Sequence, residues 1–110
     1  NKNNKLEKLD DELIDEITVM IEHEFEIEID KAGLNYSRFV SHIHYLLKRG
    51  KNNEMIKSEN KQLYELLVNT YPKTFDCSMK IKNYLIHALH CTLNDEECAY
   101  LMLHINRLCA

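Results

Sequence analysis

The sequence predicts an all-α fold, a compact bundle of five helices in one domain. Apolar residues recur every three or four positions in several segments, which is the spacing of one helix face. The chain contains only 2 Gly and 1 Pro, too few for the many turns of an all-β sandwich. Hydrophobic residues make up 45% of its 110 positions, enough to bury a core within a single domain.

The first helix is predicted to begin near Asp10, after a polar and frayed segment at residues 1–8, so that the domain covers residues 9–110. Its core face is an apolar stripe made of Ile14, Ile17, Ile21 and Phe25. Residues 24–30 then alternate charged and apolar side chains, as a strand does. Because no second strand is available for pairing, we interpret this stretch as the helix end and an extended lead into Gly33.

The second helix is predicted to start at a cap formed by Asn35 or Ser37, whose side chains can accept hydrogen bonds from free backbone amides. Gly50 is predicted to end it in a left-handed conformation, after basic residues in the last turn. Residues 51–57 follow as a polar loop. The core face of this helix consists of Phe39, Ile43, Leu46 and Leu47.

Three more helices are predicted in the second half of the chain. Ser58 can cap the third, and Tyr71 ends it because the residue before a proline avoids the helical region. Pro72 opens the fourth helix and Asn94 caps the fifth. The residues expected to face inward are Leu63, Leu66 and Leu67, then Phe75, Met79, Ile81, Leu85 and Leu89, and finally Leu101, Ile105 and Leu108.

Charge is unevenly distributed, although the formal net charge is only −4. Residues 1–32 hold eleven acidic and four basic residues, a net −7, whereas residues 33–110 hold seven acidic and ten basic residues, a net +3. The pI is about 5.8 and no dense Lys/Arg run is present, whereas nucleic-acid-binding domains concentrate basic residues. We therefore expect no direct contact between this domain and nucleic acid.

Several features are typical of a cytoplasmic protein. None of the four cysteines belongs to a Cys-x-x-Cys pair, and no secretory signal is present, so we expect reduced thiols. No apolar run approaches the length of a membrane span, so we expect no membrane contact. The chain begins with Asn rather than Met, and we expect it to be a fragment of a longer polypeptide.

Two histidines with similar surroundings are the candidate functional residues. His42 lies near one helix face with Arg38 and Arg49, and His104 shares a face with Arg107. Imidazole changes charge near neutral pH and accepts phosphoryl groups, and nearby arginines would stabilise an attached phosphate. By spacing alone, packing into the helical core explains each histidine better than a functional site does.

The other histidines and the search for known motifs give little support for a metal site or an enzyme. His44 lies about 200° around the helix from His42, so the two cannot share a metal ion. His87, His90 and Cys91 have the spacing of two zinc ligands on one face, but no convincing third or fourth ligand accompanies them. The chain lacks a Gly-rich phosphate loop, a nucleophile elbow and an HExxH motif. We therefore expect no metal, no cofactor and no enzymatic activity.

The segments around His42 and His104 follow the pattern of a known family. Residues 36–42, with the sequence Tyr-Ser-Arg-Phe-Val-Ser-His, are similar to an Arg-Phe-x-x-His segment, and residues 97–107 are similar to a Glu-x-x-Tyr-Leu-x-x-His-Ile-x-Arg ending. Together with Tyr71-Pro72, they resemble the PTS regulation domain (PRD) of the BglG/SacY family of bacterial transcriptional antiterminators. The form is that of the second of its two tandem regulatory domains, and the resemblance covers residues 9–109.

The resemblance implies a five-helix domain that forms a homodimer. In this family the histidines matched by His42 and His104 accept phosphate from HPr or a sugar-specific enzyme II. Phosphorylation shifts the dimer between open and closed arrangements, and a separate N-terminal domain binds the antiterminator RNA. His44 is a competitor for modification beside His42. The residues expected to support the phosphate are Arg38, Arg49 and Arg107.

Alternative functions remain open at this point. The chain could be the PRD of a PTS-regulated transcriptional activator. It could also be an unregulated helical dimerisation module whose histidines are merely packed. A more distant alternative is a phosphotransferase intermediate that, like HPr, would pass its phosphate onward.

Overall fold

The structure, a computed structural model, describes residues 2–57 and 61–110, with side chains from residue 9 onward. The described residues form five α-helices, namely α1 (Lys2–Phe25), α2 (Leu34–Asn52), α3 (Lys61–Thr70), α4 (Pro72–Leu89) and α5 (Asp95–Cys109). No strand occurs in this part of the chain. The predicted all-α, five-helix fold is therefore confirmed.

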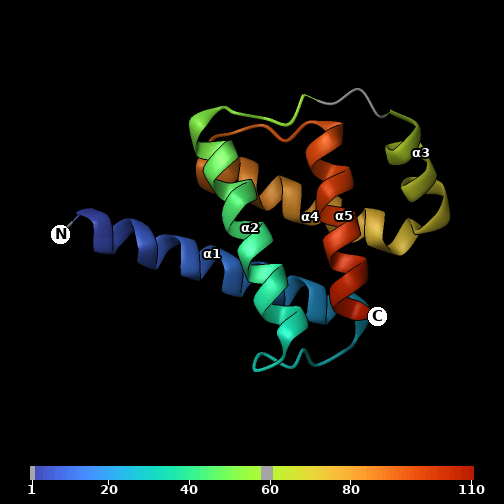
Figure 1. Cartoon of the computed structure of the whole chain (residues 1–110), viewed down its shortest axis with the longest axis horizontal. Coiled ribbons are helices and arrows are strands. Elements are labelled where there is room, and N and C mark those ends of the chain that lie inside the picture. Colours follow the sequence, from blue (N-terminus) through green and yellow to red (C-terminus); the bar gives the residue numbers. More distant parts are fainter. Residues whose placement is uncertain (1, 58–60) are drawn as a thin grey trace.

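The helices bearing the two histidines are neighbours. α2 and α5 lie side by side on one face of the domain, and α4 crosses behind them (Figure 1). α1 packs against α2 and α4, whereas α3 packs against α4 and α5. The side chains that fill the centre are almost fully buried and include Ile17, Ile21, Phe39, Ile43, Leu46, Leu47, Ile81, Leu85, Leu101 and Ile105.

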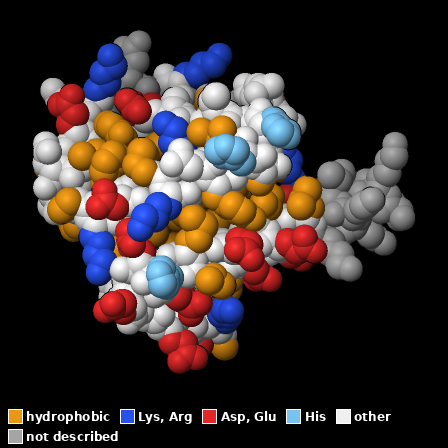
Figure 2. All heavy atoms as spheres, turned by 180° about the vertical axis from the view of Figure 1, so that it is seen from behind, with side chains coloured by type: hydrophobic (Ala, Val, Ile, Leu, Met, Phe, Trp, Pro, Cys, Tyr) orange, Lys and Arg blue, Asp and Glu red, His pale blue; other side chains and the backbone are white. Residues whose placement is uncertain are grey.

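The opposite face of the domain is mixed in character. Acidic side chains border exposed hydrophobic side chains there (Figure 2). α1 carries many exposed carboxylates on its outer face, among them Asp11, Glu12, Asp15 and Glu16. None of the helices in the described part of the chain is both long enough and apolar enough to cross a bilayer.

α1 begins at Lys2, eight positions before the start predicted near Asp10. The additional segment contains no Gly or Pro and includes the good helix formers Lys, Leu and Glu, which favours continuation of the helix. The domain limits, a frayed segment at 1–8 and a domain at 9–110, stay predictions. At the other end the helix stops at Phe25, and Glu26 takes a left-handed conformation with φ 53. Residues 27–30 lack regular structure, as predicted.

Neither Asn35 nor Ser37 caps α2, contrary to prediction. The N-cap is Gly33, which is extended and makes no side-chain cap hydrogen bond. Asp30 forms the turn just before it, because its Oδ1 accepts a 3.0 Å hydrogen bond from the amide of Ala32 and its carbonyl accepts one of 3.2 Å from the amide of Gly33. This turn leaves Gly33 in an extended conformation directly before Leu34, so the helix begins earlier than either predicted cap.

Gly50 does not end α2, which is a second correction. The helix continues to Asn52, and Asn53 takes the left-handed C-cap position with φ 55. Gly50 is buried instead, and a Cβ placed there would lie 3.3 Å from Sγ of Cys91. The glycine therefore permits α2 to pack closely on the connection between α4 and α5.

α3 is oriented differently from the prediction at one position. Leu67 is buried and Leu63 is half-buried, but Leu66 is 61% exposed, so its predicted inward position is wrong. Leu67 belongs to a small apolar cluster with Ala99 and Met102 of α5, against which Leu63, Tyr64, Val68 and Phe75 pack, and Leu66 is not part of it. The predicted cap Ser58 lies outside the described residues.

The boundaries of α4 and α5 agree with the sequence. α3 ends at Thr70, and Pro72 occupies the first turn of α4. The fourth helix ends at Leu89 with His90 in a left-handed conformation. Asn94 caps α5 as predicted, because its Oδ1 accepts a 2.9 Å hydrogen bond from the amide of Glu97.

Candidate functional site

The structure brings the two candidate histidines into direct contact. His42 projects from α2 and His104 from α5, and their rings stack with centroids 3.7 Å apart and planes inclined by 17°. His104 is 9% exposed, whereas His42 is half-buried. Residues far apart in the chain therefore form one imidazole pair at the edge of the α2–α5 contact.

Tyr100 completes an aromatic cluster with the histidines. Its hydroxyl lies 2.9 Å from Nδ1 of His42, within hydrogen-bonding distance. Tyr100 and His104 are one turn apart on α5, and their rings meet edge to face with centroids 4.4 Å apart. One α5 residue thus contacts both imidazoles, one through a hydrogen bond and the other through its ring.

A buried ion pair lies behind this cluster. Glu97 is 0% exposed, and its carboxylate accepts hydrogen bonds from Nε of Arg49 at 2.7 Å and Nη2 at 2.8 Å. This two-point contact raises the pKa of Arg49. The guanidinium carbon of Arg49 lies 4.7 Å from the centroid of the Tyr100 ring, a cation–π contact. Arg49 therefore contacts both Glu97 and Tyr100.

The surroundings keep His104 neutral. Burial, followed by electrostatic repulsion from His42, Arg107 and Arg49, lowers the pKa of His104 to about 4. Burial also raises the pKa of Tyr100, so its phenol keeps its proton. A neutral imidazole has one unprotonated ring nitrogen, which is the form that acts as a nucleophile or phosphoryl acceptor.

The sequence-predicted arginines occupy two different places. Arg38 and Arg107 are exposed and line the same shallow crevice as His42 and His104. Arg49 lies apart from that crevice lining and binds Glu97. His44 is also exposed, but it belongs to neither the crevice lining nor the aromatic cluster.

Glu97 and Tyr100 belong to the site, but neither was among the functional residues predicted from the sequence. Both belong to the Glu-x-x-Tyr part of the family-like segment, and they precede His104 by seven and four positions. This spacing places all three on one helix face, and that pattern was available in the sequence. Their partners on α2 could not be identified from spacing alone.

The segment considered for zinc does not assemble a site. His87 is exposed, and its Nδ1 lies 2.7 Å from the carbonyl oxygen of Asn83. Cys91 is buried and contacts the backbone carbonyl of Leu85, while His90 is exposed at the helix end. Among residues 9–57 and 61–110, no group of three or more possible ligands is close enough to hold a metal ion.

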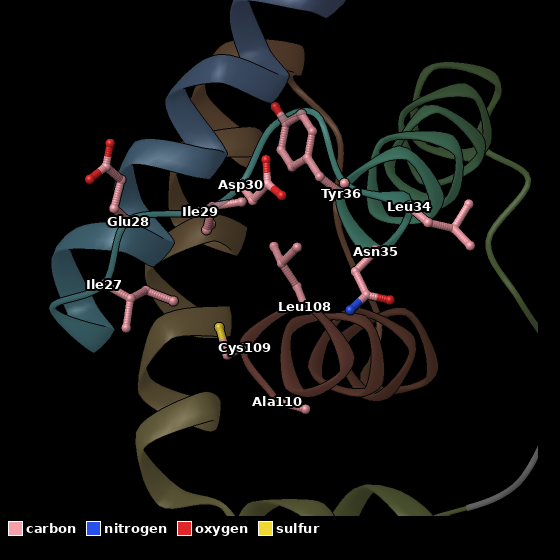
Figure 3. A pocket seen from close by; sticks show the side chains of 11 residues that line it. Ile27, Glu28, Ile29, Asp30, Leu34, Asn35, Tyr36, Leu108, Cys109 and Ala110 are labelled. Atoms are coloured by element: carbon pink, nitrogen blue, oxygen red, sulfur yellow. The ribbon is translucent and has the colours of Figure 1, made fainter.

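A larger pocket lies next to the histidine crevice. Its volume is about 390 Å³, and it is lined by the connection between α1 and α2, the start of α2 and the end of α5 (Figure 3). Leu108 points into it from α5, and Asn35 borders it from α2 (Figure 3). Both residues also line the crevice of His42 and His104, so the two hollows are adjacent.

Comparison with known proteins gives consistent matches. A family model described as PRD domain matches residues 10–108. Protein GlcT from Staphylococcus saprophyticus is 35% identical over 94 residues, which are 86% of this chain and 33% of that protein. The PtsGHI operon antiterminator of Bacillus subtilis is 32% identical over 97 residues, 88% of this chain and 34% of that protein. The transcription antiterminator LicT of Bacillus subtilis is 28% identical over 96 residues, 87% of this chain and 35% of that protein. The chain thus spans about a third of the length of these relatives.

Proposed function

We propose a function for this chain on the basis that it belongs to the PRD domain family. It is the regulatory domain of a transcriptional antiterminator controlled by histidine phosphorylation. Relatives named as antiterminators support a regulatory role rather than an enzymatic one. The observation that carries the proposal is the stacked pair of His42 and His104 in a crevice that Arg38 and Arg107 also line. The donor would be HPr or a sugar-specific enzyme II of the phosphotransferase system.

The chemistry of the pair suits a phosphoryl acceptor. His104 has a pKa of about 4, so at neutral pH it offers an unprotonated nitrogen rather than a cation. Its residual exposure of 9% lies at the crevice, where a donor can approach. His42 is more exposed and is the easier of the two to reach.

The three arginines would then have two roles. A phosphate adds roughly −1.5 to −2 charges and several hydrogen-bond acceptors. Arg38 and Arg107 are exposed and line the crevice, so they are free to bind the phosphate directly. Arg49 already gives two hydrogen bonds to Glu97, which makes it a support for the site and a weaker candidate for phosphate binding.

We propose that the readout is a change in a homodimer. His42 and His104 would lie near the dimer interface, where added charge biases two packings that differ by only a few kcal/mol. A separate RNA-binding domain of the complete protein would carry out antitermination, in agreement with the net charge of −4 on this chain. Such a regulator works where RNA is made, so we propose a cytoplasmic location.

Phosphate transfer tests the proposal directly. The chain is incubated with phosphorylated HPr or enzyme II at neutral pH or above, where phosphohistidine survives, and modified residues are mapped by mass spectrometry. Incorporation should fall in His42→Ala and His104→Ala and disappear when both are changed. The matched control is His44→Ala, which replaces an exposed histidine on the same helix and should leave incorporation unchanged.

The outcomes separate the alternatives. Unchanged incorporation after replacement of both histidines contradicts the site assignment. No incorporation, and no effect of the donor on the mass measured by light scattering, favours an unregulated dimerisation module. Rapid passage of the phosphate to a sugar-specific acceptor would instead indicate a phosphotransferase intermediate.

A further inference from the structure

We propose that Tyr100 is a positioning residue that reserves Nε2 of His42 as the atom that receives the phosphoryl group. The inference rests on the proposed function and adds to it which ring nitrogen reacts. The hydroxyl of Tyr100 lies 2.9 Å from Nδ1 of His42. An incoming phosphorus atom would have to occupy that space to bond to Nδ1. Imidazole has only two nitrogens, so this contact leaves Nε2.

Tyr100 is held in this position from several sides. Its ring packs edge to face on His104, with centroids 4.4 Å apart, and carries the guanidinium of Arg49 on its face at 4.7 Å. Arg49 is itself held by two hydrogen bonds to Glu97, which is fully buried. Displacing the hydroxyl from Nδ1 therefore requires the aromatic cluster and the ion pair to move together.

Nε2 of His42 is accessible. Among the described residues this nitrogen has no hydrogen-bond partner, and the ring's side-chain hydrogen bond is the one between Nδ1 and Tyr100. No buried side-chain nitrogen or oxygen in this part of the chain lacks a partner, so Nε2 must reach solvent. The crevice that His42 lines also contains Arg38 and Arg107, which are placed to meet a phosphate on this ring.

The transfer step balances with Tyr100 as a hydrogen-bond acceptor. In the reactive tautomer the proton is on Nδ1 and is donated to the phenol oxygen, so Nε2 has a free electron pair. That pair forms the new N–P bond as the N–P bond of a phosphohistidyl donor breaks. The electron pair of the broken bond stays on the donor imidazole, which leaves neutral because its other nitrogen is protonated. The proton on Nδ1 of His42 remains shared with Tyr100.

Nuclear magnetic resonance of the chain labelled with nitrogen-15 histidine tests the inference. The spectra report, for each ring, which nitrogen carries the proton and which one is bonded to phosphorus. The chain is phosphorylated in parallel by a protein donor, phosphorylated HPr or enzyme II, and by phosphoramidate, a small donor that needs no protein recognition. Both donors should place phosphorus on Nε2 of His42.

Substitution identifies the cause of the selectivity. Tyr100→Phe keeps the ring but removes the hydroxyl, and the ratio of Nδ1 to Nε2 modification at His42 should rise roughly five-fold or more, the factor given by one neutral hydrogen bond. The matched control is Tyr45→Phe, which removes an exposed hydroxyl from α2 and should leave the ratio unchanged. A purely structural role for Tyr100 would alter stability without altering this ratio.

Each outcome has a defined meaning. Phosphorus on Nδ1 of His42 in the unaltered chain, an unchanged ratio in Tyr100→Phe, or no modification of His42 by either donor overturns the inference. Modification of Nε2 by phosphoramidate but not by HPr or enzyme II supports the inference while contradicting the proposed function.

Discussion

The ion pair between Arg49 and Glu97 should be the most costly polar contact of the domain to break. Arg49→Met leaves a carboxylate without its partner at a position that is 0% exposed. Removing one member of a buried pair costs about 3–5 kcal/mol. Because the Arg49 side chain is 21% exposed, water can enter the vacated space, and we expect the lower limit, about 3 kcal/mol. For a chain of this size that corresponds to a fall in Tm of roughly 12 °C.

A double-mutant cycle separates the pair from its surroundings. Glu97→Met should cost less than Arg49→Met, about 1–2 kcal/mol, because the remaining arginine can reach water. The double variant replaces the pair with apolar side chains of similar volume and should lie within about 1 kcal/mol of the unaltered chain. The expected coupling energy, the sum of the two single losses less the loss in the double variant, is therefore about 4–5 kcal/mol.

Urea unfolding followed by circular dichroism measures all four chains. Lys80→Met is the control, since its ion pair with Glu24 spans 3.0 Å but Lys80 is 62% exposed, and such surface pairs contribute less than about 1 kcal/mol. A coupling energy below about 0.5 kcal/mol, or equal losses in Arg49→Met and Lys80→Met, would refute the view that this pair is buried and tightly coupled.

Three further predictions concern the folded domain. The pKa of His104 is lowered to about 4 in the folded chain, so as pH falls its imidazole is protonated in the unfolded chain before it is protonated in the folded chain. The stability present at neutral pH is therefore lost as pH falls from about 6.5 toward 4. Urea unfolding at neutral and acidic pH should differ less in His104→Leu, and an equal difference would contradict this origin. Asn94→Ala should cost about 1 kcal/mol because α5 loses its cap; an unchanged Tm argues against the cap. Leu67→Ala should lower the free energy of unfolding by about 2–3 kcal/mol, whereas Leu66→Ala should lower it by less than about 0.5 kcal/mol. Equal losses in thermal unfolding would mean that α3 does not bury Leu67 in preference to Leu66.

Apolar spacing was sufficient to predict the fold, but the start of α1 and both ends of α2 differ from the prediction. The stripe through Ile17 and Ile21 identifies its helix because a helix with one buried face has apolar residues every three or four positions, and this spacing can be read directly from the sequence. Caps depend on the backbone before and after the helix. Gly33 takes the N-cap of α2 because Asp30 forms a turn there, and neither spacing nor composition specifies that turn. Gly50 is needed because the side chain of Cys91, on another segment, packs closely against it, and this proximity is known only from the folded chain.

The candidate site divides in the same way. Placing His42 and His104 on the second and fifth helices followed from the sequence, and so did the arginines near them. Their stacking depends on how far α2 and α5 are shifted along each other, and the spacing of residues within one helix does not determine that shift. The buried pair of Glu97 and Arg49 was equally hidden, because an acidic residue in the first turn of a helix is adequately explained by the helix dipole. Burial is what distinguishes Glu97 from its exposed neighbour Asp95.

The same ion pair links the stability of the domain to the geometry of its histidines. Arg49 contacts Glu97 on one side and the ring of Tyr100 on the other, and Tyr100 contacts His42. The double replacement of Arg49 and Glu97 by Met should restore much of the stability yet remove the cation from the Tyr100 ring. If Tyr100 owes its position to that cation, the doubly substituted chain should be folded while its His42 ring loses part of its preference for Nε2. A chain that regains stability and keeps the full preference would show instead that packing against His104 is enough to position Tyr100.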